Sequence, residues 1–266
     1  MKNMGKEKGE NSEVSSGKVR ARLYCPDAKE YETVTLSADQ VRHLKVLRLK
    51  DGDAIRVFDG KGQDYEGHYD EKVRAGKLYI NSTQAPEHET HVKITLATAV
   101  PKGDRIDVLV EKVSELGVGT IVPVIFDRSV VDPRPAKIER LGRIAQEAAC
   151  QSERSLVPIV TSPMKFADLI KTFDKYTHVF MCHSSGIPLI RHPEPINPQD
   201  RVLIIVGPEG DFSDEEFQTL HNDYERVKKV SLARSILRIE TAAIAAVAQV
   251  AGKIEYCTFM QHVCPG

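Results

Sequence analysis

The chain has 266 residues, of which 41% are hydrophobic, and its formal net charge at pH 7 is −1. This length can form one large domain or two ordinary ones. The near-neutral charge does not point to a polyanionic partner, and no segment approaches the roughly 20 consecutive apolar residues that a membrane span requires. The five cysteines form no Cys-x-x-Cys pair, which favours a reduced, cytoplasmic protein, and no metal is implied.

Residues 1–19 mix Lys, Glu, Ser and Gly and contain no apolar stretch. They lack the hydrophobic region of a signal peptide, and their glutamates argue against a transit peptide. We expect this segment to be a disordered leader.

Residues 20–88 have the pattern of a small β-rich domain. Short apolar segments alternate with the turn sequences Asp51-Gly52-Asp53 and Asp59-Gly60-Lys61-Gly62, a spacing typical of a small barrel. Ser37 is a suitable N-cap for one short helix at 38–47. Strands are expected at 34–36, 54–58, 64–69 and 77–81.

After a polar linker at 84–89, residues 89–256 alternate between apolar strands and amphipathic helices. Asp104 is a suitable N-cap for the first helix, Gly117 ends it, and Ser213-Asp214-Glu215-Glu216 has the pattern of a capping box. Strands are expected at 94–99, 120–126, 178–181, 201–206 and 227–232, and helices at 104–116, 137–150, from 213 onward and at 241–253. This alternation predicts an α/β fold with a mostly parallel sheet and helices on both faces.

Two segments have the features of a ligand site in such a sheet. The apolar residues 202–206 run into Gly207-Pro208-Glu209-Gly210, and a second loop extends from Ser231 to Ala242. Ligands of open α/β sheets bind outside the carboxyl ends of the strands. The first loop lacks the Walker and Rossmann glycine patterns, and its proline and glutamate disfavour phosphate. The loop favours a neutral or cationic ligand such as S-adenosylmethionine, although a strand ending in Gly-Pro is more often only a turn.

A basic cluster lies in the first domain. Arg42, His43, Lys45, Arg48 and Lys50 fall within nine residues. Such a cluster is suited to contact phosphate groups, and it is also typical of a solvated helix face.

Several separated motifs resemble one known family. They are Asp39-Gln40-Val41-Arg42-His43-Leu44-Lys45-Val46-Leu47-Arg48 with Phe58-Asp59-Gly60-Lys61-Gly62, Pro101-Lys102-Gly103-Asp104-Arg105 with Lys112-Val113-Ser114-Glu115-Leu116-Gly117-Val118, Glu147-Ala148-Ala149-Cys150-Gln151-Ser152-Glu153-Arg154, and the two segments 202–212 and 231–242. They follow the order of the family and extend from about residue 20 to residue 255. The chain resembles the ribosomal RNA small subunit methyltransferase E family, uridine-N3 methyltransferases of 16S ribosomal RNA in the SPOUT class.

The resemblance implies a PUA-like barrel at 20–88 that helps to grip RNA, followed by a SPOUT α/β domain at 89–256 with a deep trefoil knot. It also implies a homodimer with active sites at the subunit interface. The methyl donor would be S-adenosylmethionine, and the substrate would be 16S rRNA of the small ribosomal subunit. The expected reaction is methyl transfer to N3 of a specific uridine.

The resemblance places the cofactor against three loops. The residues implied for the cofactor are Cys182, His183, Val206, Gly207, Leu232, Ala233, Ile236, Leu237, Arg238 and Thr241. The residues implied for RNA binding are Arg22, Arg42, Lys45, Arg48, Lys102, Arg105 and Gln151.

Methylation at N3 requires the loss of the N3 proton, so hydrogen-bond donors to O2 and O4 of the uracil would stabilise the anion. The candidates for catalysis are Arg238, Arg154, Glu209 and Glu240, and none is assigned as the base. Glu240 is equally suited to favour a helix dipole, and Arg154 to form an ion pair at a helix end.

Three positions depart from the family pattern, namely Asp211, Ala233 and Ser235. If Ala233 had to adopt a left-handed backbone, it would cost about 1 kcal/mol relative to glycine. Ser235 stands where an arginine is usual, and the neighbouring Arg234 is a candidate to replace it. These departures leave open a catalytically weak RNA-binding or ribosome-assembly factor. A SPOUT ribose 2′-O-methyltransferase is a further alternative.

The segment 257–266 contains two cysteines and one histidine, too few ligands for a zinc site, and we expect a flexible tail there. Methyl transfer to a ring nitrogen needs no covalent enzyme intermediate. Cys182 is therefore expected to be a loop residue near the cofactor.

Overall fold

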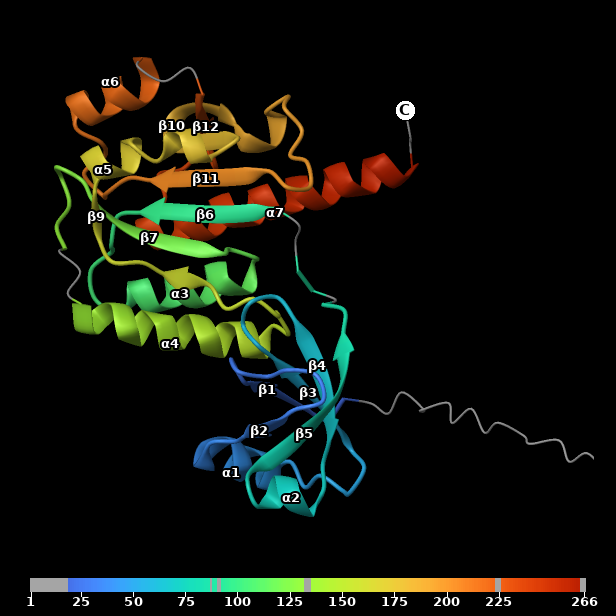
Figure 1. Cartoon of the computed structure of the whole chain (residues 1–266). Coiled ribbons are helices and arrows are strands. Elements are labelled where there is room, and N and C mark those ends of the chain that lie inside the picture. Colours follow the sequence, from blue (N-terminus) through green and yellow to red (C-terminus); the bar gives the residue numbers. More distant parts are fainter. Residues whose placement is uncertain (1–18, 87, 90–91, 132–134, 223–225, 264–266) are drawn as a thin grey trace, which may run out of the picture.

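The computed structural model describes residues 19–86, 88–89, 92–131, 135–222 and 226–263. They form two sheets, one of five strands and one of seven, in two parts of the molecule (Figure 1). The expected leader lies outside the described residues, apart from its last residue.

The N-terminal sheet has the strand order β1-β3-β4-β5-β2. Its strands are β1 (Ala21–Tyr24), β2 (Thr33–Thr35), β3 (Ala54–Phe58), β4 (Asp64–His68) and β5 (Lys77–Gln84), with the helices α1 (Ala38–Val46) and α2 (Glu71–Arg74). β1 pairs in parallel with β3, and the other pairs are antiparallel. The pattern did not predict β1, because its four residues are too few to show a clear alternation.

Helix α1 confirms the expected cap. The Ser37 side chain accepts a hydrogen bond from the Gln40 backbone N–H, and the Gln40 side chain accepts one from the Ser37 N–H. This reciprocal arrangement is a capping box, which satisfies two of the free donors at a helix start. Leu44 is the buried residue of the helix, so most of its other side chains remain available to solvent.

The C-terminal sheet has the strand order β12-β10-β11-β6-β7-β8, and β9 also pairs with β7. Its strands are β6 (Lys93–Thr98), β7 (Thr120–Ile125), β8 (Ile159–Val160), β9 (Met164–Lys165), β10 (His178–Pro188), β11 (Arg201–Val206) and β12 (Val227–Ser231). The helices are α3 (Arg105–Glu115), α4 (Pro135–Gln151), α5 (Phe166–Ile170), α6 (Asp214–Asn222) and α7 (Ile239–Val263), with 3-10 turns at Phe173–Lys175 and Leu189–Arg191. All of its strand pairs are parallel, which confirms the expected α/β fold.

The middle strand β11 is buried from Val202 to Val206 because it lies inside the sheet and α7 packs against it and β6. β10 lies between β11 and β12. This order is consistent with the trefoil knot implied by the resemblance, and the knot itself remains a prediction.

Most predicted element boundaries agree with the structure. An exception is β10, which was predicted to end at Met181 and continues to Pro188. Ser213 and Glu216 form the expected capping box of α6, with N–H bonds of 2.9 and 3.3 Å to each other's side chains. Asp104 precedes α3 as expected, but its side chain makes no cap hydrogen bond. Helix α7 continues to Val263 and so occupies the first part of the expected tail.

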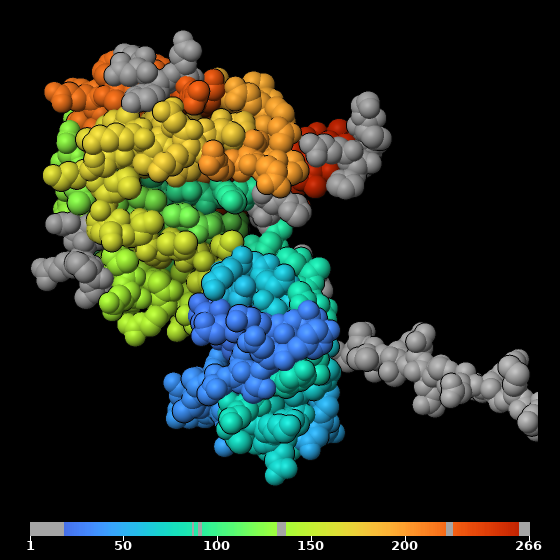
Figure 2. Space-filling view, viewed as in Figure 1, coloured from blue at the N-terminus to red at the C-terminus, as the bar shows by residue number. Residues whose placement is uncertain are grey.

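A buried polar network joins the two parts of the molecule. Arg22 on β1 makes two hydrogen bonds of 2.9 and 3.0 Å to the carboxylate of Asp64 on β4. Ser155, which follows α4, donates to the same carboxylate at 2.7 Å. Arg22 also donates to the backbone carbonyl of Arg154 at 3.0 Å. Figure 2 shows the N-terminal part in direct contact with the C-terminal part.

The Arg154 side chain extends the same network. Its guanidinium donates to the carbonyl oxygens of Ser114 and Val118 at 2.7 and 2.8 Å, and to Glu89 at 3.0 Å. Glu89 also accepts the backbone N–H of Leu156. Arg154 therefore holds together the end of α3, the segment between the sheets and the end of α4.

We expect Asp64→Asn to lower the free energy of unfolding by about 3 kcal/mol, because it leaves the largely buried charge of Arg22 without its partner. Urea denaturation of the full chain would measure this loss. Asp168→Asn is the control, since Asp168 and its partner Lys171 are exposed on the surface. Equal unfolding midpoints for the two variants would contradict a stabilising role for the network.

Candidate functional site

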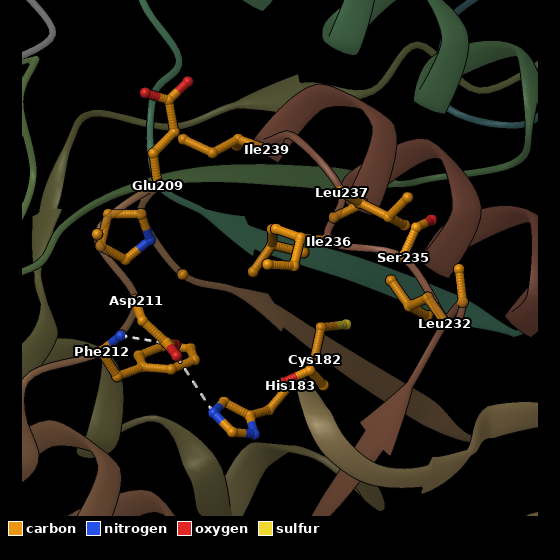
Figure 3. Close-up of a pocket in the computed structure, with 17 residues that line it drawn as sticks. Cys182, His183, Glu209, Asp211, Phe212, Leu232, Ser235, Ile236, Leu237 and Ile239 are labelled. Carbon is orange, nitrogen blue, oxygen red and sulfur yellow. Dashed lines mark hydrogen bonds and ion pairs between the residues drawn. The ribbon is translucent and has the colours of Figure 1, made fainter.

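A cavity of about 410 Å³ opens beside residues 182–184 of β10 and the loops that follow β11 and β12. The backbone pairing explains its position, since Cys182 on β10 is in register with both Val206 on β11 and Val230 on β12. Cys182 stands at a register shift within β10, while Val206 ends β11 and Val230 lies one residue before the end of β12. These three residues reach one edge of the sheet, and the chain that follows each of them forms one wall. Figure 3 shows side chains from these walls around the cavity.

The first wall follows Cys182. Burial raises the pKa of the Cys182 thiol to about 12, so this side chain is a neutral thiol near pH 7 and a poor nucleophile. Cys182 lines the cavity, as expected for a residue near the cofactor, but it lies within β10 and not in a loop as predicted. The next residue, His183, packs its ring on Phe217 of α6 with centroids 4.9 Å apart.

The second wall is the loop from Gly207 to Phe212. The absence of a side chain at Gly207 lets the buried Phe212 ring approach closely, since a Cβ at that position would lie 2.8 Å from the ring. The Arg128 guanidinium fixes the far side of the loop by donating to the carbonyl oxygens of Gly210 and Phe212, both at 3.0 Å. Asp211 between them has a φ of 62°, in the left-handed region.

The third wall runs from Leu232 to Leu237. The Gln249 side chain of α7 donates to the Leu232 carbonyl at 3.1 Å and so ties the start of this loop to the helix. Ile236 is 97% exposed although it is apolar and lines the cavity. Ala233 is not among the described residues with positive φ, so the cost of a left-handed backbone that was considered for it does not arise.

Arg105 joins two of the predicted carboxylates. Its guanidinium lies 3.1 Å from Glu209 of the second wall and 4.0 Å from Glu240 at the start of α7. The second oxygen of Glu240 is buried and has no hydrogen-bond partner among the described residues. Lys102 is exposed nearby on a small hollow that Glu209 also lines.

The structure brings together most of the residues predicted for the cofactor. Those that line the cavity are Cys182, His183, Val206, Gly207, Leu232, Ala233, Ile236 and Leu237, and Glu209 lines it as well. Arg238 and Thr241 are exposed beside it and do not line it. The neighbouring Arg234 is also exposed and outside the lining.

Two other predicted residues lie far from this cavity in the described chain. Arg154 is buried in the network between the two sheets, so its placement does not support a contact with the uracil. Arg22 belongs to the same network and makes its hydrogen bonds inside the protein rather than offering a free cation to RNA. Gln151 is exposed at the end of α4, and Arg42, Lys45 and Arg48 are exposed on α1 and just after it.

The sequence reasoning missed several residues of the lining. The lining residues that were not assigned to the site are Ser184, Pro208, Gly210, Asp211, Phe212, Ser235, Ile239 and Ala242, and all but Ser184 lie within the two segments 202–212 and 231–242. Ile239 and Ala242 are three residues apart on α7, and this helical spacing would have placed both on the side that faces the loop. Phe212 gave no such signal, because its contact with Gly207 depends on how the loop folds.

The chemistry of the lining fits S-adenosylmethionine. Apolar side chains such as Leu232, Ile236 and Phe212 suit the adenosine, and the charged residues of the lining are the carboxylates of Glu209 and Asp211. No Lys or Arg is among the described residues that line the cavity. This distribution disfavours a phosphate ligand and suits a positively charged one.

Within the part of the chain that the structure describes, no group of three His, Cys, Asp or Glu side chains is arranged to hold a metal ion. No helix among the described residues is long and apolar enough to cross a membrane.

Comparison with known proteins gives consistent matches along the chain. Residues 88–251 match the RNA methyltransferase domain, and residues 36–72 match the RNA methyltransferase PUA domain. Ribosomal RNA small subunit methyltransferase E of Synechocystis sp. is 30% identical over 237 residues, which cover 88% of this chain and 77% of that protein. The protein of the same name from Rickettsia conorii is 32% identical, with 83% and 90% of the two chains covered.

A solved structure agrees with these matches. The ribosomal RNA small subunit methyltransferase E from Neisseria gonorrhoeae, crystallised with S-adenosylmethionine, superposes with a TM-score of 0.73. It is 31% identical in sequence, and the match covers 91% of this chain and 97% of that one. The chain has a cavity suited to a positively charged ligand at one edge of its sheet, and it is similar to these proteins along nearly its whole length. It therefore belongs to the ribosomal RNA small subunit methyltransferase E family.

Proposed function

We propose that this protein transfers the methyl group of S-adenosylmethionine to N3 of a specific uridine in the 16S rRNA of the small ribosomal subunit. The observation that carries the proposal is the cavity between residues 182–184 of β10 and the loops after β11 and β12, with its apolar walls and its carboxylates. The relatives that share this fold are named for small-subunit ribosomal RNA, and one was crystallised with this cofactor. A ribosomal substrate is consistent with the expected cytoplasmic location.

When bound, S-adenosylmethionine supplies a methyl group on a positively charged sulfur, and the S–CH3 bonding electrons stay with the sulfur as N3 forms its new bond. The protein has to accept or stabilise the charge that appears when N3 loses its proton. Arg238 is exposed beside the cavity, which suits a guanidinium that reaches for a uracil oxygen. Glu209 and Glu240 hold Arg105 near the cavity, and we propose that Arg105 also faces the substrate.

The RNA backbone is proposed to contact the exposed cations of both parts of the molecule. Arg42 and Lys45 are exposed three residues apart on α1, Arg48 is exposed just after its C-terminal end, and Lys102 lies near the cavity. Phosphate contacts of this kind fix the position of an RNA and leave the base free to enter a pocket. The buried network at Arg154 would keep the two cationic regions at a constant separation.

We also propose that the protein acts as a homodimer. Helix α7 extends beyond the sheet, and Tyr256 and Phe259 near its end are 63% and 61% exposed (Figure 1). Large apolar side chains gathered on one helix end are typical of a surface that another chain covers. The nearly fully exposed Ile236 at the cavity is a further apolar group that a partner or a substrate could cover.

The activity can be tested in cells. In a strain that lacks the gene, mass spectrometry of nucleosides from 16S rRNA should show the loss of N3-methyluridine, and the restored gene should bring it back. An unchanged level in the deletion strain would contradict the proposed reaction. A loss of a ribose 2′-O-methylated nucleoside instead would identify the alternative SPOUT activity.

We expect Gly207→Ala to weaken the binding of S-adenosylmethionine at least tenfold. The new methyl group would lie 2.8 Å from the buried Phe212 ring, and the ring has to move into the cavity or out of the core. Isothermal titration calorimetry would measure the affinity. Gly119→Ala is the matched control, because its Cβ would lie at an ordinary 3.6 Å from the Ile94 carbonyl oxygen and Gly119 does not line the cavity, so binding should be unchanged.

The dimer has its own test. Light scattering coupled to size-exclusion chromatography should give twice the mass of one chain. Phe259→Glu should reduce that mass toward the monomer, because it introduces a charge into the covered surface. Val46→Glu, at an equally exposed position on α1, should leave the mass unchanged. A monomeric wild-type protein would contradict the proposed dimer.

A further inference from the structure

The two carboxylates of the cavity lining have different partners. Glu209 is paired with Arg105 at 3.1 Å, so its charge is balanced by a permanent cation. Asp211 has one ion-pair partner among the described residues, His183, at 3.3 Å, and a histidine is a cation only when it is protonated. Figure 3 shows this pair together on one side of the cavity, with Leu232 and Ser235 on the other side.

The loop holds Asp211 in a defined orientation. Its φ of 62° is a conformation that aspartate tolerates better than most residues, and its Oδ1 accepts the N–H of Phe212 at 2.9 Å. The neighbouring cation Arg128 uses one guanidinium nitrogen on the carbonyl oxygens of Gly210 and Phe212, which flank Asp211. Arg128 therefore fixes the backbone on both sides of Asp211 and forms no ion pair with its carboxylate in the described structure.

His183 orients the carboxylate without neutralising it. The backbone N–H of Ser185 points at Nδ1 of His183 at 3.2 Å, and the Ser185 hydroxyl lies 2.8 Å from the same nitrogen. Because a backbone N–H can only donate, Nδ1 is the acceptor and the proton of the neutral ring is on Nε2. Nε2 is the nitrogen that faces Asp211, so a neutral imidazole can donate to the carboxylate.

The other cation on this side of the cavity also leaves Asp211 unpaired. Lys229 of β12 lies over the ring of Phe217, with its nitrogen 5.3 Å from the centroid. The Phe217 ring packs on His183, and His183 in turn contacts Asp211. Asp211 thus presents a negative charge at the cavity that no described lysine or arginine neutralises.

We propose that Asp211 makes the cavity select the methyl donor over the demethylated product. This inference rests on the proposed function. S-Adenosylmethionine and S-adenosylhomocysteine have the same adenosine, amino and carboxylate groups, and they differ by one methyl group and the positive charge of the sulfur. A fixed carboxylate at the cavity stabilises the charged ligand and gives the neutral-sulfur product no such gain. After each transfer the product is then held less tightly, and a new donor replaces it.

The size of the effect follows from the exposure of the carboxylate. The Asp211 side chain is 58% exposed, so solvent screens its charge and the gain is that of a surface interaction. We expect the preference for S-adenosylmethionine over S-adenosylhomocysteine to fall about three- to fivefold in Asp211→Asn. Asparagine keeps the size, the tolerance of positive φ and the oxygen that accepts the Phe212 N–H.

Isothermal titration calorimetry of the full-length protein with each of the two ligands tests the inference. The affinity for S-adenosylmethionine should fall in Asp211→Asn while that for S-adenosylhomocysteine stays constant, and 1 M salt should shrink the difference between variant and wild type. Asp214→Asn is the matched control, since Asp214 is exposed three residues away and does not line the cavity. Its ligand preference should equal that of the wild type.

Each outcome has a distinct meaning. If wild-type protein binds neither ligand, the proposed function fails. If it binds both and Asp211→Asn changes both affinities equally, or changes neither, the selective role of Asp211 is overturned. Asp211→Gly tests whether the change in Asp211→Asn comes from a distorted backbone, because glycine adopts the same φ without strain. It should show the same loss of preference for S-adenosylmethionine.

Discussion

Parallel pairing of β10 with β11 and β12 is the constraint on which the site depends. The backbone hydrogen bonds put Cys182, Val206 and Val230 in one row across the sheet. Because all three strands point the same way, the segments that follow these three residues meet at one edge, although they are separated by many residues in sequence. A slip of one residue in either pair would turn the end of that strand to the other face and would break up the cavity.

The second requirement is a fixed relation between the two sheets. Burying charged groups such as Asp64 and Arg154 is unfavourable unless every charge finds a partner, and the network provides partners from both parts of the chain. Such a network penalises any movement that breaks it. The cations of α1 and the cavity therefore keep a set separation, which is useful to a protein that has to hold an RNA and position one base.

Charge also distinguishes the residues around the cavity. Arg105 balances Glu209, while a neutral imidazole orients Asp211 and leaves it negative. The same short loop contains a glycine that admits the Phe212 ring and an aspartate in the left-handed region. The residues of this loop therefore determine both the shape of the cavity and its electrostatic potential.

The sequence alone determined most of the longer elements and much of the site. Capping boxes at Ser37 and Ser213 and the change from short strands to alternating strands and helices are local patterns, and local hydrogen bonds enforce them. The loops after β11 and β12 could be recognised in the same way, because residues next to one another in sequence form each wall.

Only the tertiary structure decided which distant residues meet. Arg154 appeared suited to a substrate, yet three partners from other segments hold its side chain between the sheets. Asp211 stood out only as an unusual residue in its loop until the fold placed it opposite His183. The physical reason is that a side chain's partners, burial and charge balance depend on contacts between segments far apart in the chain, and a one-dimensional pattern does not contain them.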